Sequence, residues 1–185
     1  MLLEKTKSMA VLGVMAALST VLTVLGTYIS VNTVFFTAAA AFLVGIAVVE
    51  YGPGRGTLFF VVCSLLDFFI NPNPLHILLY VVFALYFLVA EGSYIGLKKR
   101  SGRKKERLHG GIRLVVFLIL YVPAVIFLPE LFVSDTVLER WMDASWFLPV
   151  ILAAGIPLWL IFDMAYFAVK KEVIKIFRTV KSGNK

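Results

Sequence analysis

Six apolar runs, nearly free of charge, follow one another along the chain with short polar segments between them. An apolar run of roughly 20 residues can cross the hydrocarbon core of a bilayer as a helix. The 185-residue chain is 61% hydrophobic and its mean hydropathy is +0.93, more apolar than a soluble domain tolerates. We therefore predict an all-α integral membrane protein, with residues 1–185 forming one membrane domain, a six-transmembrane-helix bundle.

The predicted spans are bounded by Gly, Pro and charged residues, and they cover about 8–29, 34–49, 57–70, 75–97, 112–132 and 146–169. The segment YGPGRG, residues 51–56, ends the second span because Gly and Pro interrupt helices. The second and third spans are short for a bilayer of ~30 Å, so one tight helical hairpin buried by the other spans is an alternative for this pair. Residues 170–185 form a basic amphipathic tail, predicted to continue the last helix along the inner membrane surface.

Positive charge gives the chain a predicted direction. Of the 18 Lys and Arg residues, only Arg140 lies in a segment on the side opposite the N-terminus. Because cytoplasmic loops carry an excess of Lys and Arg, both termini are predicted to be cytoplasmic. The net charge of +7 then reflects loops that face anionic lipid, and no nucleic-acid partner is predicted. The first apolar run is too long for a signal peptide and is expected to remain as a span.

Motifs for chemistry are weak. Cys63 is the one cysteine, so no internal disulfide can form. His76 has no second His at ligand spacing, which argues against zinc, and the sequence holds no GxxxxGK[ST] phosphate loop. Ser64, His76 and Asp67 could form a catalytic trio, but most chains offer such a trio. We predict no enzyme activity, no cofactor and no metal site.

Three acidic residues lie within predicted spans, where a charge costs several kcal/mol. Asp67 lies near the outer end of its span, and both a ligand contact and a pairing with the first amides of the fourth span are open for it. Glu91 and Asp163 lie near the inner ends. For these two we favour pairing with inner basic residues such as Arg113 or Lys98 over a contact with a partner protein.

The stretch DFFINPNPLHILLY, residues 67–80, gathers polar side chains at the predicted outer turn between the third and fourth spans. His76 and Tyr80 are four residues apart and share a helix face. Turn chemistry and interfacial aromatics explain each residue alone, whereas the whole cluster suits a small, partly aromatic polar solute. The predicted substrate-binding residues are Asn32, Asp67, Asn71, Asn73, His76, Tyr80, Trp141 and Trp146.

Small residues recur four apart in the first two spans, which allows close helix approach in lipid. Internal packing and a docking face for another membrane protein are both open. Three segments resemble the substrate-binding (S) components of energy-coupling factor transporters. They are MAVLGVMAALSTVLT in the first span, the alanine-rich FTAAAAFLVGIA in the second, and the YGPGRG break before a short helix. The resemblance covers about residues 8–95, and the second half of the chain matches in layout only.

The resemblance implies high-affinity binding of a vitamin or related micronutrient at the outer half of a protein in a prokaryotic cell membrane. It also implies a separate energising module, made of a membrane coupling protein and two ATPases, to which such a subunit docks. The implied docking residues are Ala10, Gly13, Ala16 and Ala17, with Gly13-xxx-Ala17 in place of the family's Ala-xxx-Ala. The start Met1-Leu-Leu lacks the histidine of nickel and cobalt members, so a metal cargo is not expected.

Two other functions compete with uptake. A non-transport membrane scaffold, such as a cell-shape or assembly protein, has a similar size and number of spans, and in that protein the polar turn would be turn chemistry alone. A small membrane enzyme acting on lipid is the third possibility. No signature in the sequence assigns the solute.

Overall fold

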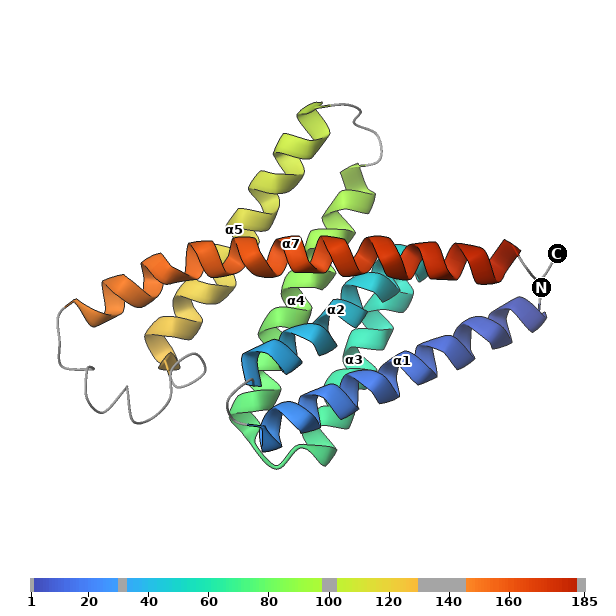
Figure 1. The fold of residues 1–185 in the computed structure, drawn as a ribbon, viewed down its shortest axis with the longest axis horizontal. Coiled ribbons are helices and arrows are strands. Elements are labelled where there is room, and N and C mark those ends of the chain that lie inside the picture. Colours follow the sequence, from blue (N-terminus) through green and yellow to red (C-terminus); the bar gives the residue numbers. More distant parts are fainter. Residues whose placement is uncertain (1, 30–32, 98–102, 130–145, 183–185) are drawn as a thin grey trace. The chain divides into compact units, whose positions relative to one another are not determined.

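The protein is described by a computed structural model that covers residues 2–29, 33–97, 103–129 and 146–182, with side chains placed for 6–29, 33–97, 106–129 and 146–176. Across these ranges the regular elements are helices, and no strand is present. They are α1 (Leu2–Tyr28), α2 (Thr33–Tyr51), α3 (Pro53–Ile70), α4 (Pro74–Gly96), α5 (Arg103–Phe127) and α7 (Phe147–Ser182) (Figure 1).

Each of these six helices contains a stretch long and apolar enough to cross a membrane. The prediction of an all-α chain with six candidate spans is therefore confirmed for the described residues, and the chain has the character of a multi-pass membrane protein. Contacts divide the chain into two compact units, Met1–Val116 and Phe117–Lys185, with the division inside α5. The packing of all six helices into one bundle stays a prediction.

The helix that contains the predicted third span, 57–70, begins earlier than that span. α3 begins at Pro53, and Gly52 alone separates it from the end of α2. Proline suits the first turn of a helix, since its missing N–H would have no partner there. Gly52 makes the reversal with a φ of 88°, a left-handed conformation that favours glycine. α2 and α3 thus form a tight hairpin, yet each is long enough to cross a membrane by itself.

The predicted fifth span, 112–132, overlaps α5, which begins earlier, at Arg103, and ends at Phe127. Its first turns are polar, and hydropathy marks where a helix becomes apolar and not where it begins. α1 extends to Leu2 for the same reason. The predicted helical continuation beyond residue 169 is confirmed, since α7 runs unbroken to Ser182.

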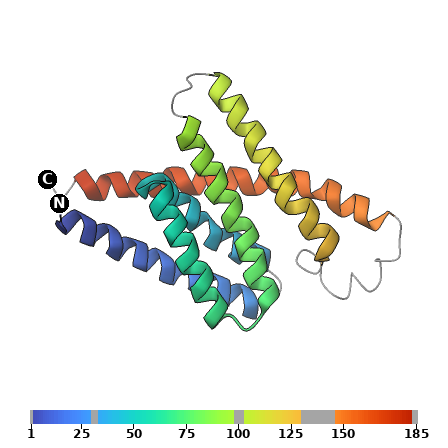
Figure 2. The same cartoon turned by 180° about the vertical axis from the view of Figure 1, so that it is seen from behind.

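In the first unit, α2 contacts α1, α3 and α4 and is the most buried of the four. Its sequence explains this position, because small side chains let neighbouring helices approach closely in lipid. The fully buried small residues of α2 are Ala38, Ala40, Ala41 and Ala47. Figure 2 shows the same group from behind, with α3 beside α4.

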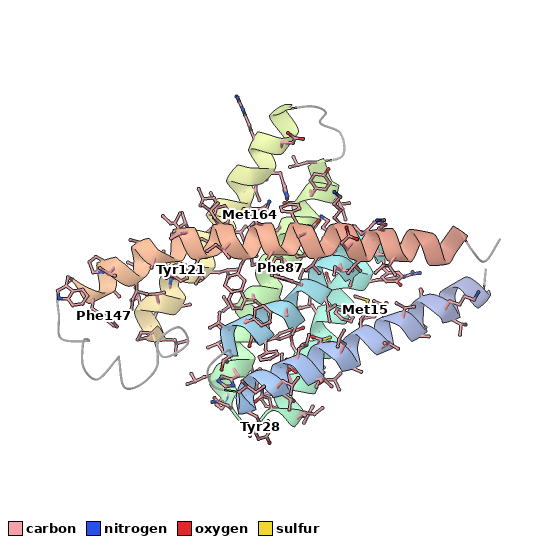
Figure 3. All side chains as sticks on the ribbon, in the orientation of Figure 1. Met15, Tyr28, Phe87, Tyr121, Phe147 and Met164 are labelled. Atoms are coloured by element: carbon pink, nitrogen blue, oxygen red, sulfur yellow. The ribbon has the colours of Figure 1, made fainter. Side chains whose placement is uncertain are left out.

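α1 and α3 run in the same direction. Two hydrogen bonds join them, Thr23 to Asp67 and Thr27 to Asn71, and the partners in each are 44 residues apart. The short connections therefore bring the last turns of α1 and α3 and the first turns of α2 and α4 to one end of this unit, at the bottom of the view in Figure 1. Tyr28, labelled in Figure 3, marks this end of α1.

In the second unit, the last part of α5 packs antiparallel to α7. The Tyr121 hydroxyl donates to the carbonyl of Ile151 over 2.7 Å, and Phe117 stacks between the rings of Tyr121 and Trp159. Gly155 lies directly under the Tyr121 ring, where a Cβ atom would collide with it. Most apolar side chains on α7 are exposed, including Met164.

Candidate functional site

Polar side chains on three helices of the first unit repeat at every fourth residue. A four-residue step keeps side chains on one helix face, and here the three polar faces meet. We call this set the polar ladder, and it consists of Ser19, Thr23 and Thr27 on α1, Cys63, Asp67 and Asn71 at the end of α3, and His76 and Tyr80 on α4.

The layer nearest the helix ends contains Thr27, Asn71 and His76. The Asn73 backbone N–H donates to Asn71 Oδ1 over 3.1 Å, which fixes the orientation of the Asn71 amide. The Thr27 hydroxyl donates to the same Oδ1 over 2.9 Å, and the Thr23 carbonyl oxygen is a second acceptor 3.2 Å from it. Both of these neighbours can only accept, so the Thr27 proton points to one or the other.

His76 Nδ1 lies 2.9 Å from Thr27 Oγ1. Because Thr27 gives its one proton to Asn71 Oδ1 or to the Thr23 carbonyl, His76 must be the donor in this contact, and the hydrogen-bond network assigns a proton to Nδ1. In the neutral ring, Nε2 is then left as an acceptor. The half-buried His76 thus presents an acceptor at the end of the ladder.

The middle layer consists of the Thr23 hydroxyl and the Asp67 carboxylate. Thr23 Oγ1 lies 2.6 Å from Asp67 Oδ1, the short distance of a hydroxyl that donates to a carboxylate. Asp67 is 1% exposed, and its second oxygen, Oδ2, has no hydrogen-bond partner among the described residues. Asn71 is 5% exposed, and its Nδ2 likewise has none there.

The deepest layer contains Ser19, Cys63 and Tyr80. The hydroxyls of Ser19 and Tyr80 are 3.5 Å apart, and the Cys63 thiol contacts both side chains. Tyr80 was predicted to contact the solute and is fully buried. It therefore forms the floor of the ladder, one helical turn below His76.

Asn73 belongs to the turn. Its side chain accepts from the Leu75 backbone N–H over 3.0 Å, and Pro74 follows at the first helical position. This arrangement is an ordinary helix N-cap, as the sequence predicts for these two residues. The Asn73 side-chain oxygen is therefore occupied, whereas Asp67 and Asn71 each keep an unused polar atom.

The structure does not bring together all the predicted binding residues. Asn32 and Trp141 lie outside the described residues. Trp146 is exposed at the start of α7 in the second unit. The residues that meet are Asp67, Asn71, Asn73, His76 and Tyr80, with Thr23 and Thr27 from α1.

Sequence reasoning missed Ser19, Thr23 and Thr27. Each looks unremarkable alone, since Ser and Thr are common in membrane helices. The available signal was their spacing, because three hydroxyls at steps of four on an apolar helix form one polar stripe. Cys63, Asp67 and Asn71 follow the same four-residue step along α3, but this spacing does not say which helices are neighbours.

The predicted docking residues on α1 divide between two faces. Ala10, Gly13 and Ala17 are exposed, and a Cβ atom at Gly13 would meet no atom within 4 Å. Ala16 is only 6% exposed and packs inside the unit. The exposed face also carries large apolar side chains, namely Met9, Val14, Leu18 and Val21.

The other end of the first unit holds buried charge. The rings of Tyr94 on α4 and His109 on α5 lie 5.0 Å apart. On α4, the buried Glu91 lies about one turn before Tyr94, and on α5, the buried Arg113 lies about one turn after His109. Both steps lead away from the ring contact toward the same side. The register therefore favours the predicted pairing of Glu91 with Arg113, while Asp163 is half-buried on α7 in the second unit.

Among the residues that the structure describes, no three His, Cys, Asp or Glu side chains are grouped so as to hold a metal ion. No protein-family model, curated protein or solved structure matches the chain.

Proposed function

We propose that this protein is a membrane-embedded binding subunit for uptake of a vitamin or related small micronutrient. The observation that carries this function is the polar ladder, in which a buried carboxylate and a buried amide each keep a polar atom that no described residue bonds. The resemblance of residues 8–95 to S components of energy-coupling factor transporters supports the same function. The resemblance implies a site in the outer half, lined by outer loops and the fourth to sixth helices, and His76 and Tyr80 at the start of α4 lie in that region.

A purely structural ladder explains the unused atoms poorly. Polar side chains that join helices in lipid stabilise them by hydrogen bonding, and leaving a buried group unbonded costs about 1–3 kcal/mol. Replacing Asp67 with an apolar residue would remove that cost. A bound solute offers the missing hydrogen-bond partners. Binding would therefore remove the cost of leaving these groups unbonded, and this gain would contribute to the affinity.

We further propose that the subunit works with a separate ATP-hydrolysing module, made of a membrane coupling protein and two ATPases. The exposed face of α1 supports this partner, because small residues at positions 10, 13 and 17 permit close approach of another helix. The large apolar side chains beside them add contact area. The distribution of Lys and Arg supports cytoplasmic termini, and the family resemblance implies a prokaryotic plasma membrane.

The test is native mass spectrometry of the protein purified in mild detergent, followed by thermal-shift measurements with a panel of vitamins. We expect a small molecule to be retained and the same compound to raise the melting temperature. No retained molecule and no response to any vitamin would remove the transport function. The alternative, a membrane scaffold that uses the α1 face for assembly alone, would then be favoured.

A further inference from the structure

Two polar atoms without a hydrogen-bond partner among the described residues lie about one helical turn apart, one on Asp67 of α3 and one on Asn71, which directly follows α3. In the ionised carboxylate, Asp67 Oδ2 is an acceptor, and Asn71 Nδ2 is a donor. The four-residue step places both side chains on one face of α3, the face that meets α1 through Thr23 and Thr27. A group that binds both must therefore offer a donor next to an acceptor.

The Asn71 assignment does not depend on an arbitrary choice of amide orientation. Asn71 Oδ1 accepts from the Asn73 backbone N–H and from the Thr27 hydroxyl. If the amide were flipped, its NH2 group would lie opposite the Asn73 N–H, and two donors would face each other. Nδ2 is consequently the atom of this amide that has no partner among the described residues. His76 Nε2, left as an acceptor by the Nδ1 contact with Thr27, adds a second acceptor near the helix ends.

The charge of the site also restricts its ligand. In the part of the chain that the structure describes, no basic side chain offsets Asp67, whose one hydrogen-bonding partner is the neutral Thr23 hydroxyl. A second anion beside this carboxylate would add repulsion in a poorly solvated place. A cationic or neutral N–H donor instead supplies the missing partner.

We infer that the polar ladder binds a neutral or cationic nitrogen compound in which an N–H donor stands next to an acceptor, as in a carboxamide or an amino-substituted nitrogen heterocycle. Asp67 accepts from the N–H group, and Asn71 donates to the neighbouring carbonyl or ring nitrogen. Anionic carboxylates of the same shape are rejected. This inference rests on the proposed uptake function and narrows the class of solute.

Two pairs of probes with matched rings test the inference on the full-length purified protein. Nicotinamide is compared with nicotinate, and 2-aminopyrimidine with pyrimidine-2-carboxylate, by thermal shift and native mass spectrometry. We expect the amide or amino member of a pair to raise the melting temperature and the carboxylate members to have no effect. Response to a carboxylate, or to neither neutral probe, would overturn the inference.

Variants locate the binding. Asp67→Asn keeps an acceptor for Thr23 but removes the charge, and it should weaken binding of the neutral probe about tenfold or more. Glu91→Gln is the matched control, a buried carboxylate toward the other end of α4, and should leave the affinity unchanged. Equal affinity in Asp67→Asn and the unaltered protein would overturn the assignment of Asp67.

The two proposals fail in different ways. A retained molecule that is anionic, or that binds equally well after Asp67→Asn, overturns the inferred solute class and leaves uptake in place. The absence of any retained or stabilising small molecule instead counts against the uptake function itself.

Discussion

At the scale of single residues, proton counting decides what the polar ladder can bind. Thr27 has one proton, and its hydroxyl lies within hydrogen-bonding distance of Asn71 Oδ1, the Thr23 carbonyl oxygen and His76 Nδ1. Because the first two can only accept, His76 donates through Nδ1. Among the described residues, Asp67 Oδ2 and Asn71 Nδ2 are left without a hydrogen-bond partner, and these are the atoms that we propose for a ligand.

Thr23→Val should destabilise the protein by about 1–3 kcal/mol, because it removes the donor to Asp67 without changing the shape of the side chain. The measurement is the free energy of unfolding in detergent. Thr20→Val is the matched control on the same helix, since the buried Thr20 hydroxyl oxygen has no partner among the described residues. We expect the control to be neutral or slightly stabilising, and equal losses in both variants would contradict the role of Thr23.

At the scale of the helices, the α2–α3 hairpin depends on one close approach. A Cβ atom added to Gly56 would lie 2.8 Å from the Cα atom of Val48 and would also collide with the Val48 side chain. The backbone of one helix would have to move to admit it. The hairpin positions the end of α3, and therefore Asp67 and Asn71, against α1.

Gly56→Ala should accordingly cost about 1–3 kcal/mol of stability through overpacking. Thermal unfolding in detergent would measure the loss. Gly54→Ala, two residues earlier in the same helix, is the control, because a Cβ atom there meets nothing within 4 Å. A melting temperature that is the same in both variants would show that the hairpin is not held by this contact.

The exposed face of α1 supplies a second element-scale prediction. Gly13→Leu should prevent co-purification with the coupling protein while solute binding is retained, because the bulky side chain blocks close helix approach. The variant should still fold, since a side chain at residue 13 meets open space. Gly92→Leu on α4 is an equally open control, and loss of association in both variants would contradict a specific role for α1.

At the scale of the whole molecule, the basic residues predict which ends of the helices face the cytoplasm. Cys63 is the one cysteine and is fully buried, so replacing it with alanine gives a background for single-cysteine labelling. Ser101 belongs to the predicted cytoplasmic loop and Ser145 to the predicted outer loop. The two serines offer matched positions for the same substitution.

In intact cells, a membrane-impermeant maleimide should label Ser145→Cys and should label Ser101→Cys only after permeabilisation. The reason is the excess of Lys and Arg in the segments that include Ser101. The reverse pattern would place the termini outside. It would also put the polar ladder on the cytoplasmic side and remove the proposed route of uptake.

The sequence alone determined the class of protein. Long apolar runs must be helical in lipid, since every backbone N–H and C=O group needs a partner there, and this requirement is local. The turn between α3 and α4 could also be predicted from the sequence, because the roles of Asn73 as N-cap and Pro74 as first helical residue depend on adjacent residues only. The starts of α3 and α5 could not be predicted in this way, because both helices begin in polar residues, where hydropathy gives no signal.

The tertiary structure alone decided the composition of the site. Asp67 and Asn71 were visible as polar residues, but their partners Thr23 and Thr27 lie 44 residues away on another helix. Such a pairing depends on which helices are neighbours and in what register, and no local pattern encodes it. For the same reason Ala16 could be grouped with Ala10 and Gly13 in the sequence and yet lie on the buried side of α1.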